Sequence, residues 1–277
     1  MFEATLLALG SAVLHAGWNL LVKTSDERFL TAWGQFLVGG ICFLPVLLLT
    51  GLPPGDAVPF LVASSLVHVV YVGALVRAYH HGDFSFAYPL ARGGGALLAA
   101  IGGVAFLGDY LSVPAWLSIG IVVVGLVSLV RPHVGMLAIS WALLTALTIG
   151  TYTTLDAAGA RRSDSGFGYG VVLVVGAALA LTVVGVSRGR GGDFVRYLRT
   201  TDRRRVLAGG LASVLAYSMV LTAIRLAPVG YVAALRESSV VLGATMGWLL
   251  LHERLGRARV VSSLVIAAGL VLLIATR

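Results

Sequence analysis

The sequence predicts an all-α integral membrane protein with ten transmembrane helices, arranged as two inverted five-helix repeats. Three observations support this fold class: an apolar composition, ten apolar runs long enough to span a membrane, and an internal repeat. Hydrophobic residues make up 58% of the 277 residues and charged residues only 12%, with a mean hydropathy of +0.94. Because a soluble globular protein has about 25% charged residues, lipid must cover much of this surface.

A helix needs about 20 mostly apolar residues to cross the hydrocarbon core of a bilayer. The runs of this chain are continuous and not alternating, which favours helices over membrane β-strands. The ten runs lie near residues 4–22, 29–50, 57–79, 84–106, 112–130, 135–155, 167–187, 206–226, 229–251 and 258–275. No basic segment precedes the first run, so we expect a retained span and not a cleaved signal.

The internal repeat relates residues 71–130 to residues 215–274 at a constant spacing of 144, without a gap. The matched pairs are Arg92 and Arg236, Gly95 and Ser239, Ala99 and Gly243, Gly103 and Gly247, Leu107 and Leu251, Asp109 and Glu253, Leu111 and Leu255, and Gly125 and Gly269. Five spans per repeat is an odd number, so the second repeat must be inverted relative to the first. We therefore expect a first repeat at 1–132 and a second at 133–277.

The net charge of +8 is concentrated in loops. Seven arginines lie in one loop: Arg188, Arg190, Arg196, Arg199, Arg203, Arg204 and Arg205. This distribution is typical of a cytoplasmic loop beside anionic lipid. A regulatory role at the lipid surface is a second interpretation and nucleic-acid binding a third, which we do not favour. On the side of the membrane that carries the arginine-rich loop, the loops contain 14 Lys and Arg residues in total. The loops and the C-terminus on the other side contain 4. The positive-inside rule thus predicts that both termini lie outside the cytoplasm.

Motifs for catalysis, metal binding and cofactor binding are missing from the sequence. Cys42 is the only cysteine, which excludes an intramolecular disulfide and a cysteine metal cluster. His80, His81 and Asp83 lie in a short turn without further ligands nearby, so we expect no metal site there. The chain contains no nucleophile elbow, phosphate-binding glycine loop or nucleotide-binding domain. We therefore expect neither an enzyme nor a cofactor, and no use of ATP.

Two arginines lie inside apolar spans at matching positions of the repeats, Arg92 in the fourth span and Arg236 in the ninth. A charge at the bilayer centre costs at least roughly 2.5–3.5 kcal/mol, so each should face protein or water. Snorkelling or a structural ion pair is one interpretation. The other, which we favour, is a pair of guanidinium groups that face a central cavity and bind a carboxylate or a phosphoryl group.

Further polar side chains share helix faces by their spacing. The candidate substrate-binding residues beside the arginines are His15, Trp18 and Asn19 on the first span, Tyr71 on the third, Tyr88 on the fourth, Tyr152 on the sixth and Tyr217 on the eighth. His68 accompanies Tyr71, and Ser11, Thr148 and Ser213 extend the polar faces. For any single residue an interhelical hydrogen bond is an equally good interpretation. Glu237 and Asp156 are the candidates for a coupling proton, and neutralisation of Arg92 or Arg236 is the competing role of Glu237.

Small residues four apart on the fourth and ninth spans predict a close helix-packing seam. They are Gly95, Ala99 and Gly103 on one span and Ser239, Gly243 and Gly247 on the other.

Ten spans, two inverted repeats and an acidic residue after the fourth span of each repeat (Asp109 and Glu253) resemble the EamA-type family of the drug/metabolite transporter superfamily. The first span, Leu14-His15-Ala16-Gly17-Trp18-Asn19, resembles a subgroup that opens with a His-Ala-x-Trp-Asn signature. The resemblance covers essentially the whole chain. It implies a cavity bounded by spans 1, 3, 4, 6, 8 and 9, with access alternated by rocking of the two halves. It also implies export, and termini in the cytoplasm, in contrast to the charge count.

From these observations we expect a secondary active transporter that exports a small polar metabolite, such as an amino acid or another compound with a carboxylate or phosphoryl group. Its expected partners are this substrate, the lipid bilayer and a coupling proton, with the chain as monomer or homodimer. A single lysine against nineteen arginines is typical of a GC-rich bacterial genome, so we expect the bacterial inner membrane. The alternatives are a membrane enzyme for a lipid-linked substrate and a structural or sensory membrane protein.

Overall fold

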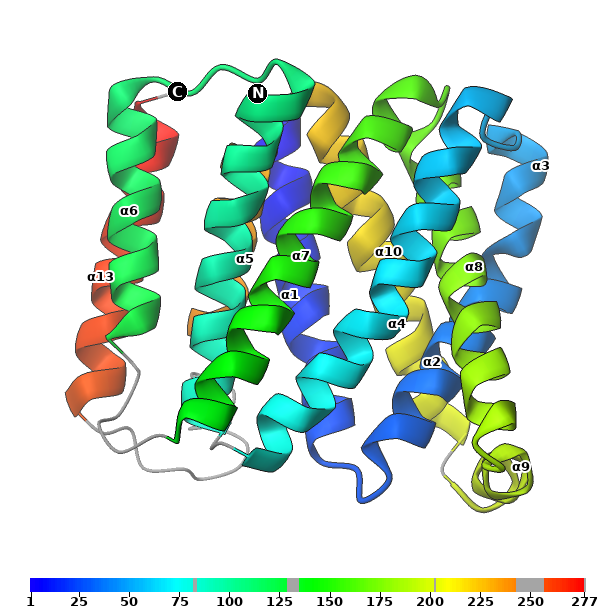
Figure 1. Cartoon of the computed structure of the whole chain (residues 1–277). Coiled ribbons are helices and arrows are strands. Elements are labelled where there is room, and N and C mark those ends of the chain that lie inside the picture. The colour runs from blue at the N-terminus through cyan, green and yellow to red at the C-terminus, as the bar shows by residue number, and fades with distance from the viewer. Residues whose placement is uncertain (82–83, 129–134, 202, 243–256, 277) are drawn as a thin grey trace.

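The computed structural model describes residues 1–81, 84–128, 135–201, 203–242 and 257–276, and every regular element in these ranges is a helix (Figure 1). The elements are α1 (Phe2–Lys23), α2 (Arg28–Phe43), η1 (Leu44–Val46), α3 (Leu47–Thr50), η2 (Gly55–Ala57), α4 (Val58–His81), α5 (Phe84–Leu107), α6 (Val113–Val127), α7 (Met136–Arg162), α8 (Gly166–Ser187), α9 (Gly191–Thr200), α10 (Arg203–Leu226), α11 (Val229–Arg236) and α13 (Arg257–Ala275). The predicted all-α class is thus confirmed for the described part of the chain.

Within the described residues, seven helical segments are long and apolar enough to cross a membrane. They are Phe2–Val22, Arg28–Thr50, Gly55–Ala78, Leu90–Leu107, Met136–Arg162, Gly166–Ser187 and Arg203–Leu226. The predicted fifth and tenth spans correspond to the shorter apolar stretches Val113–Val127 and Val261–Ala275. The predicted ninth span begins with α11 and continues into residues 243–256, which lie outside the described residues. The count of ten spans therefore stays a prediction.

Two local features differ from the simple pattern of apolar runs. The second run is not one regular helix: it passes from α2 through η1 into α3, with Pro45 in the first turn of η1. Proline has no N–H to donate and clashes with the preceding turn, so it interrupts the α-helix there. The arginine-rich loop contains a helix of its own, α9, whose Phe194 is buried while Arg196 and Arg199 are exposed.

The two halves of the chain are interleaved and do not form separate bundles. Among the described residues, the most extensive helix contacts join α5 to α7, α4 to α7, α1 to α10, α6 to α13 and α2 to α10. Each of these pairs combines a helix before residue 132 with one after residue 133. The main hydrophobic core likewise takes residues from both halves, for example Ala99 and Leu126 with Leu221 and Leu235.

Small residues allow these close contacts between the halves. A Cβ added at Gly95 would meet the Ile149 side chain of α7, and one added at Gly150 would meet Leu98 of α5. The small residues of α5 thus form the packing seam predicted from their spacing. Gly243 and Gly247 of the matching set lie outside the described residues. Both termini lie at the same end of the bundle, and α9 lies at the opposite end (Figure 1).

Helices α2 and α10 touch backbone to backbone at Gly39, and this contact makes a testable prediction. A Cβ at Gly39 would lie 2.5 Å from the carbonyl oxygen of Gly210, and a backbone cannot swing aside as a side chain can. We expect Gly39→Ala to lower the free energy of unfolding by about 1–3 kcal/mol, the usual cost of overpacking. The measurement is the thermal unfolding midpoint in detergent. Gly120→Ala is the control, because a Cβ there meets nothing within 4 Å; equal midpoints for both variants would contradict the close contact.

Candidate functional site

The ninth predicted span is interrupted at its two charged residues. Helix α11 ends at Arg236, Glu237 forms a turn, and helical structure resumes at Ser238. The N–H of Glu237 donates to the Ala234 carbonyl at 3.0 Å, three residues back and not four. The hydroxyl of Ser238 also donates to a carbonyl three residues back, that of Leu235, at 2.8 Å. Interrupted helices at the interface of two repeats are typical of substrate sites in secondary transporters.

Glu237 forms a buried ion pair with Arg92 of α5. The Arg92 Nη2 donates to Oε1 of Glu237 at 2.6 Å and its Nε to Oε2 at 3.3 Å, so the contact is bidentate. Only 7% of the Arg92 side chain and 3% of the Glu237 side chain are exposed. The pair joins the two halves of the chain. The structure thus shows Arg92 in the structural ion pair of the first interpretation and not snorkelling to the headgroups. The favoured interpretation, a guanidinium that faces a central cavity, stays a prediction.

Arg236 points into the same region but is bound differently. Its guanidinium carbon lies 5.6 Å from the ring centre of Tyr217, in a cation–π contact. Its Nε is buried and has no hydrogen-bond partner among the residues that the structure describes. Arg92 and Glu237 are within electrostatic range of Arg236, but the Glu237 carboxylate accepts its hydrogen bonds from Arg92. Arg236 is thus a buried cation with a free donor.

Tyr217 connects Arg236 to a second carboxyl group. Its hydroxyl donates to Oδ2 of Asp156 on α7, and Asp156 is fully buried. The other oxygen, Oδ1, has no hydrogen-bond partner. A buried carboxyl oxygen without a donor is costly, so this group is suited to holding a proton.

An aromatic cluster lies beside these charges. The ring centres of His68 and Tyr152 are 4.2 Å apart, and those of Tyr71 and Tyr152 5.5 Å. Tyr217 closes the cluster at 6.3 Å from Tyr152. The rings come from α4, α7 and α10, so both halves contribute.

The first helix brings His15 to the same region. His15 is within electrostatic range of Arg92 and Arg236, and its ring packs edge-on against Trp18 at 5.1 Å. The side-chain amide of Asn19 donates to the His15 carbonyl at 2.7 Å, one turn back in the same helix.

Several predicted polar residues are satisfied within their own helices. Ser11 donates to the Ala8 carbonyl, Thr148 to Thr145 and Ser213 to Gly210. These residues do not reach across to another helix. The side chain of Tyr88 lies outside the described residues.

His68, which the sequence places with Tyr71 on the polar face of the third span, is a member of the cluster. It lies three residues before Tyr71 and therefore on the same side of α4, and this spacing was the signal. Its Nδ1 contacts the Ser64 carbonyl at 2.9 Å, one turn back. This contact leaves the ring facing Tyr152.

A second link between the halves lies at the end of the bundle that holds the termini. Asp109 accepts the N–H of Val229 at 2.7 Å and so caps the first turn of α11. Its other oxygen pairs with Nη1 of Arg161 at 2.7 Å, and Arg161 also donates to the carbonyls of Ile224 and Ala227. Glu253, the counterpart of Asp109 in the repeat, lies outside the described residues.

His80 and His81 at the end of α4, with Asp83, are the residues where the sequence predicts no metal site despite their ligand types. His80 and His81 are exposed and contact one another edge-on, with ring centres 5.0 Å apart. Asp83 lies outside the described residues. Within the part of the chain that the structure describes, no group of three His, Cys, Asp or Glu side chains is close enough to hold a metal ion.

Together, apolar spanning helices, interleaved halves and buried ionisable groups at a helix break define a membrane protein of the transporter class. A family model of the EamA-like transporter family matches residues 136–275. The chain belongs to the EamA-like transporter family, part of the drug/metabolite transporter superfamily. Members of this family are transporters and not enzymes. The family resemblance predicted from the sequence is confirmed.

Solved structures show the same fold. One, described as "Crystal structure of protein", has a TM-score of 0.75 and 15% sequence identity, over 99% of this chain and 99% of that chain. At this identity the similarity concerns the fold alone. A comparison with curated proteins gave no match.

The buried ion pair predicts a large loss of stability when one partner is removed. Glu237→Gln breaks the buried Arg92–Glu237 pair by removing the negative partner, and breaking a buried pair in this way typically costs about 3–5 kcal/mol. We expect the double variant Arg92→Gln/Glu237→Gln to lose less unfolding free energy than the two single variants lose together. Thermal unfolding in detergent measures these losses. Glu27→Gln is the control, because the Glu27–Arg190 pair is exposed and such pairs contribute at most about 1 kcal/mol. Strictly additive effects at Arg92 and Glu237 would contradict the pair.

Proposed function

We propose that the chain is a secondary active transporter for a small polar metabolite that carries a carboxylate or a phosphoryl group, such as an amino acid. Arg236 is the observation on which this proposal depends most. It is a buried guanidinium with an unsatisfied Nε, and it lies where both halves of the chain meet. A planar guanidinium binds carboxylate and phosphoryl groups through two parallel hydrogen bonds.

The surroundings of Arg236 fit a substrate that is partly apolar. Tyr217 covers one side of the guanidinium, and His68, Tyr71 and Tyr152 form an aromatic surface nearby. Binding sites commonly combine such apolar walls with a few placed polar groups. His15, Trp18 and Asn19 extend the proposed site along α1.

For the transport cycle we propose alternating access between two inverted five-helix repeats, at 1–132 and 133–277, in a ten-span bundle. The family match over 136–275 supports a unit in the second half. The contacts between the halves converge on α11, whose first turn is capped by Asp109 and whose end is held by Arg92. A rocking motion of one repeat against the other would therefore change the surroundings of Arg236.

For the coupling ion we propose a proton bound at Asp156 or Glu237. When either carboxyl group is protonated, one carboxylate faces the two guanidinium groups of Arg92 and Arg236. The resulting net positive charge favours an anionic group in the site. A proton and an anionic substrate would then stabilise each other's binding.

The direction of transport has two candidates. The family resemblance implies export. The charge balance of the site favours joint movement of proton and anion, which drives uptake under an inward proton gradient.

For the location we propose the inner membrane of a bacterium. The basic helix α9 lies at the end of the bundle away from both termini (Figure 1). By the positive-inside rule that end faces the cytoplasm.

The role of Arg236 is tested by ligand screening and transport. A metabolite panel of amino acids, other carboxylates and phosphorylated compounds is screened by thermal shift, in which a ligand at 100 times its Kd stabilises by about 2.7 kcal/mol. We expect Arg236→Gln to weaken binding of the best ligand about tenfold or more, since a charged hydrogen bond is lost, and to abolish its transport in proteoliposomes. Arg196 is exposed on α9, and we expect Arg196→Gln to keep both the binding of the ligand and its transport. Wild-type transport by Arg236→Gln would overturn the proposed site.

The role of Asp156 is tested separately, with an imposed pH gradient. We expect Asp156→Asn to lose gradient-driven accumulation while it keeps substrate exchange at equal pH, because the amide keeps the shape of the side chain but cannot release a proton. The same vesicles report direction: accumulation driven by an inward proton gradient indicates uptake, and efflux driven by it indicates export. Unchanged gradient-driven transport in Asp156→Asn would exclude this carboxyl as the proton carrier.

A further inference from the structure

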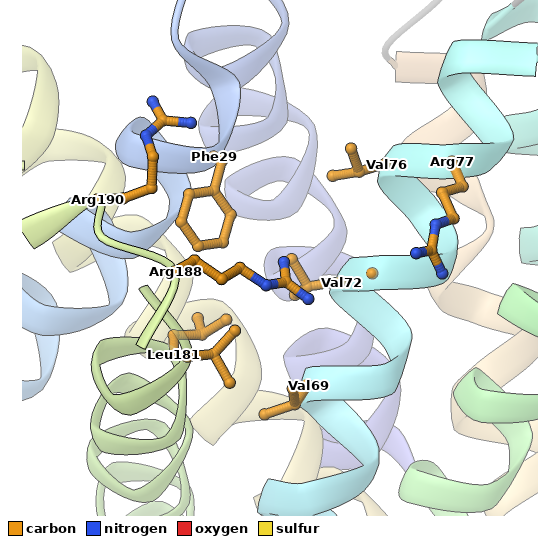
Figure 2. A pocket seen from close by; sticks show the side chains of 10 residues that line it. Phe29, Val69, Val72, Val76, Arg77, Leu181, Arg188 and Arg190 are labelled. Atoms are coloured by element: carbon orange, nitrogen blue, oxygen red, sulfur yellow. The ribbon is translucent and has the colours of Figure 1, made fainter. Parts of the chain in front are cut away.

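A pocket separate from the candidate site lies between α2, α4 and α8, with a volume of about 270 Å³ (Figure 2). We call it the α2–α4–α8 pocket. It shares none of its lining residues with the buried charged and aromatic cluster described above. Its walls are apolar, with Phe29 from α2, Val69 and Val72 from α4, and Leu181 from α8.

One end of this pocket is strongly basic. Arg77 of α4 and Arg188, directly after α8, belong to its lining, as does Arg190. Figure 2 shows the Arg188 side chain extending across the pocket toward Val72. Among the lining residues, all of which the structure describes, there is no carboxylate.

The three arginines differ in how their charge is used. The charge of Arg190 is paired with Glu27 at 3.3 Å and with Asp193 at 2.8 Å. Arg77 lies over the ring of Trp141 at 4.7 Å, which leaves its charge unneutralised. The side chain of Arg188 makes no hydrogen bond or ion pair with any residue that the structure describes. Arg188 is therefore available to an anion that enters the pocket.

Helix α9 places the basic end at the level of the lipid headgroups. Phe194 of α9 stacks on Trp33 of α2, with ring centres 3.7 Å apart, and the hydroxyls of Tyr197 and Thr31 are hydrogen-bonded at 2.8 Å. This short helix has its apolar face on the bundle and exposed arginines opposite, as is typical of helices in the membrane interface.

The apolar part of the pocket lies deeper in the membrane than its basic end. Val69 and Val72 lie one to two turns further into α4 than Arg77, and Leu181 two turns further into α8 than Arg188. Next to the pocket, Val70 of α4 and Val183 of α8 expose 51% and 69% of their surface. On a membrane-spanning helix such side chains face acyl chains.

We propose that the α2–α4–α8 pocket is a binding site for an anionic phospholipid. The lipid phosphate contacts Arg188 and lies near Arg77, and an acyl chain follows Val69, Val72 and Leu181 into the membrane. Unneutralised arginines without a facing carboxylate favour an anionic headgroup over a zwitterionic one, whose ammonium group would find no partner. Basic pockets between spanning helices at the headgroup level bind lipids of this charge.

Gly73 offers a way to fill the pocket without a change of charge. It lines the pocket, and a Cβ added there meets nothing within 4 Å. Gly73→Leu places a side chain in the volume assigned to the acyl chain, and leucine is a better helix former than glycine. Gly120→Leu on α6 is the matched control, because its Cβ also meets open space.

The experiment measures lipid binding to the purified full-length chain in a neutral detergent, by native mass spectrometry and by thermal shift. The probes are phosphatidylglycerol, phosphatidylcholine and inorganic phosphate. We expect phosphatidylglycerol to bind and to raise the unfolding midpoint, and the other two probes to do neither. Arg188→Gln should weaken phosphatidylglycerol binding roughly tenfold, by loss of a charged hydrogen bond, and Gly73→Leu should abolish it. Arg196→Gln and Gly120→Leu should bind as the wild type does.

Three results would overturn the proposal. Equal binding of phosphatidylcholine would show that charge is not recognised, and equal stabilisation by inorganic phosphate would show a free-anion site without an acyl chain. Wild-type phosphatidylglycerol binding in Arg188→Gln would show that this pocket is not the site. Arg188 is exposed, so its substitution tests the proposal even if Gly73→Leu folds poorly. Neither variant touches Arg236, so the result is independent of the proposed transport function.

Discussion

The structure depends on the requirement that a charge inside a membrane must have a partner. Arg92 and Arg236 both lie within apolar helices, and water cannot solvate them there. Arg92 meets this requirement across the two halves of the chain, through its bidentate contact with Glu237. A buried pair of this kind adds little net stability compared with apolar residues, but removal of one partner is costly. The pair therefore specifies how the halves fit together more than it stabilises them.

Helix α11 shows what this requirement does to local structure. It has only eight residues, too few for a stable helix in isolation. Residues of the first half hold both of its ends: Asp109 accepts the N–H of Val229 at the start, and Arg92 binds Glu237 just after the last residue. At the break the two adjacent charges separate, Glu237 toward Arg92 and Arg236 toward Tyr217. The break thus leaves one cation neutralised and the other open to a ligand.

The polar residues of the spanning helices form two groups with different uses. Ser11, Thr148, Ser213 and Asn19 donate to carbonyls of their own helices. Serine and threonine hydroxyls always have such a carbonyl in reach, one turn back. A second group makes its contacts across helix interfaces: Arg92 pairs with Glu237, and Tyr217 donates to Asp156. This second group supplies the charged part of the candidate site.

The sequence by itself determined the membrane class, the helical secondary structure, the family and the helices from which the candidate residues come. These properties follow from composition and from periodicity along the chain. Both can be read from each helix separately, without knowledge of how the helices pack. It did not determine that Glu237 pairs with Arg92 and not with Arg236, that Tyr217 donates to Asp156, or that His68 joins the aromatic cluster. It also missed α9 and the pocket between α2, α4 and α8. Each of these depends on the rotation of one helix against another, and on a break that redirects two neighbouring side chains. Adjacent helical residues point about 100° apart, so only the packing of the whole bundle decides which partner each one meets.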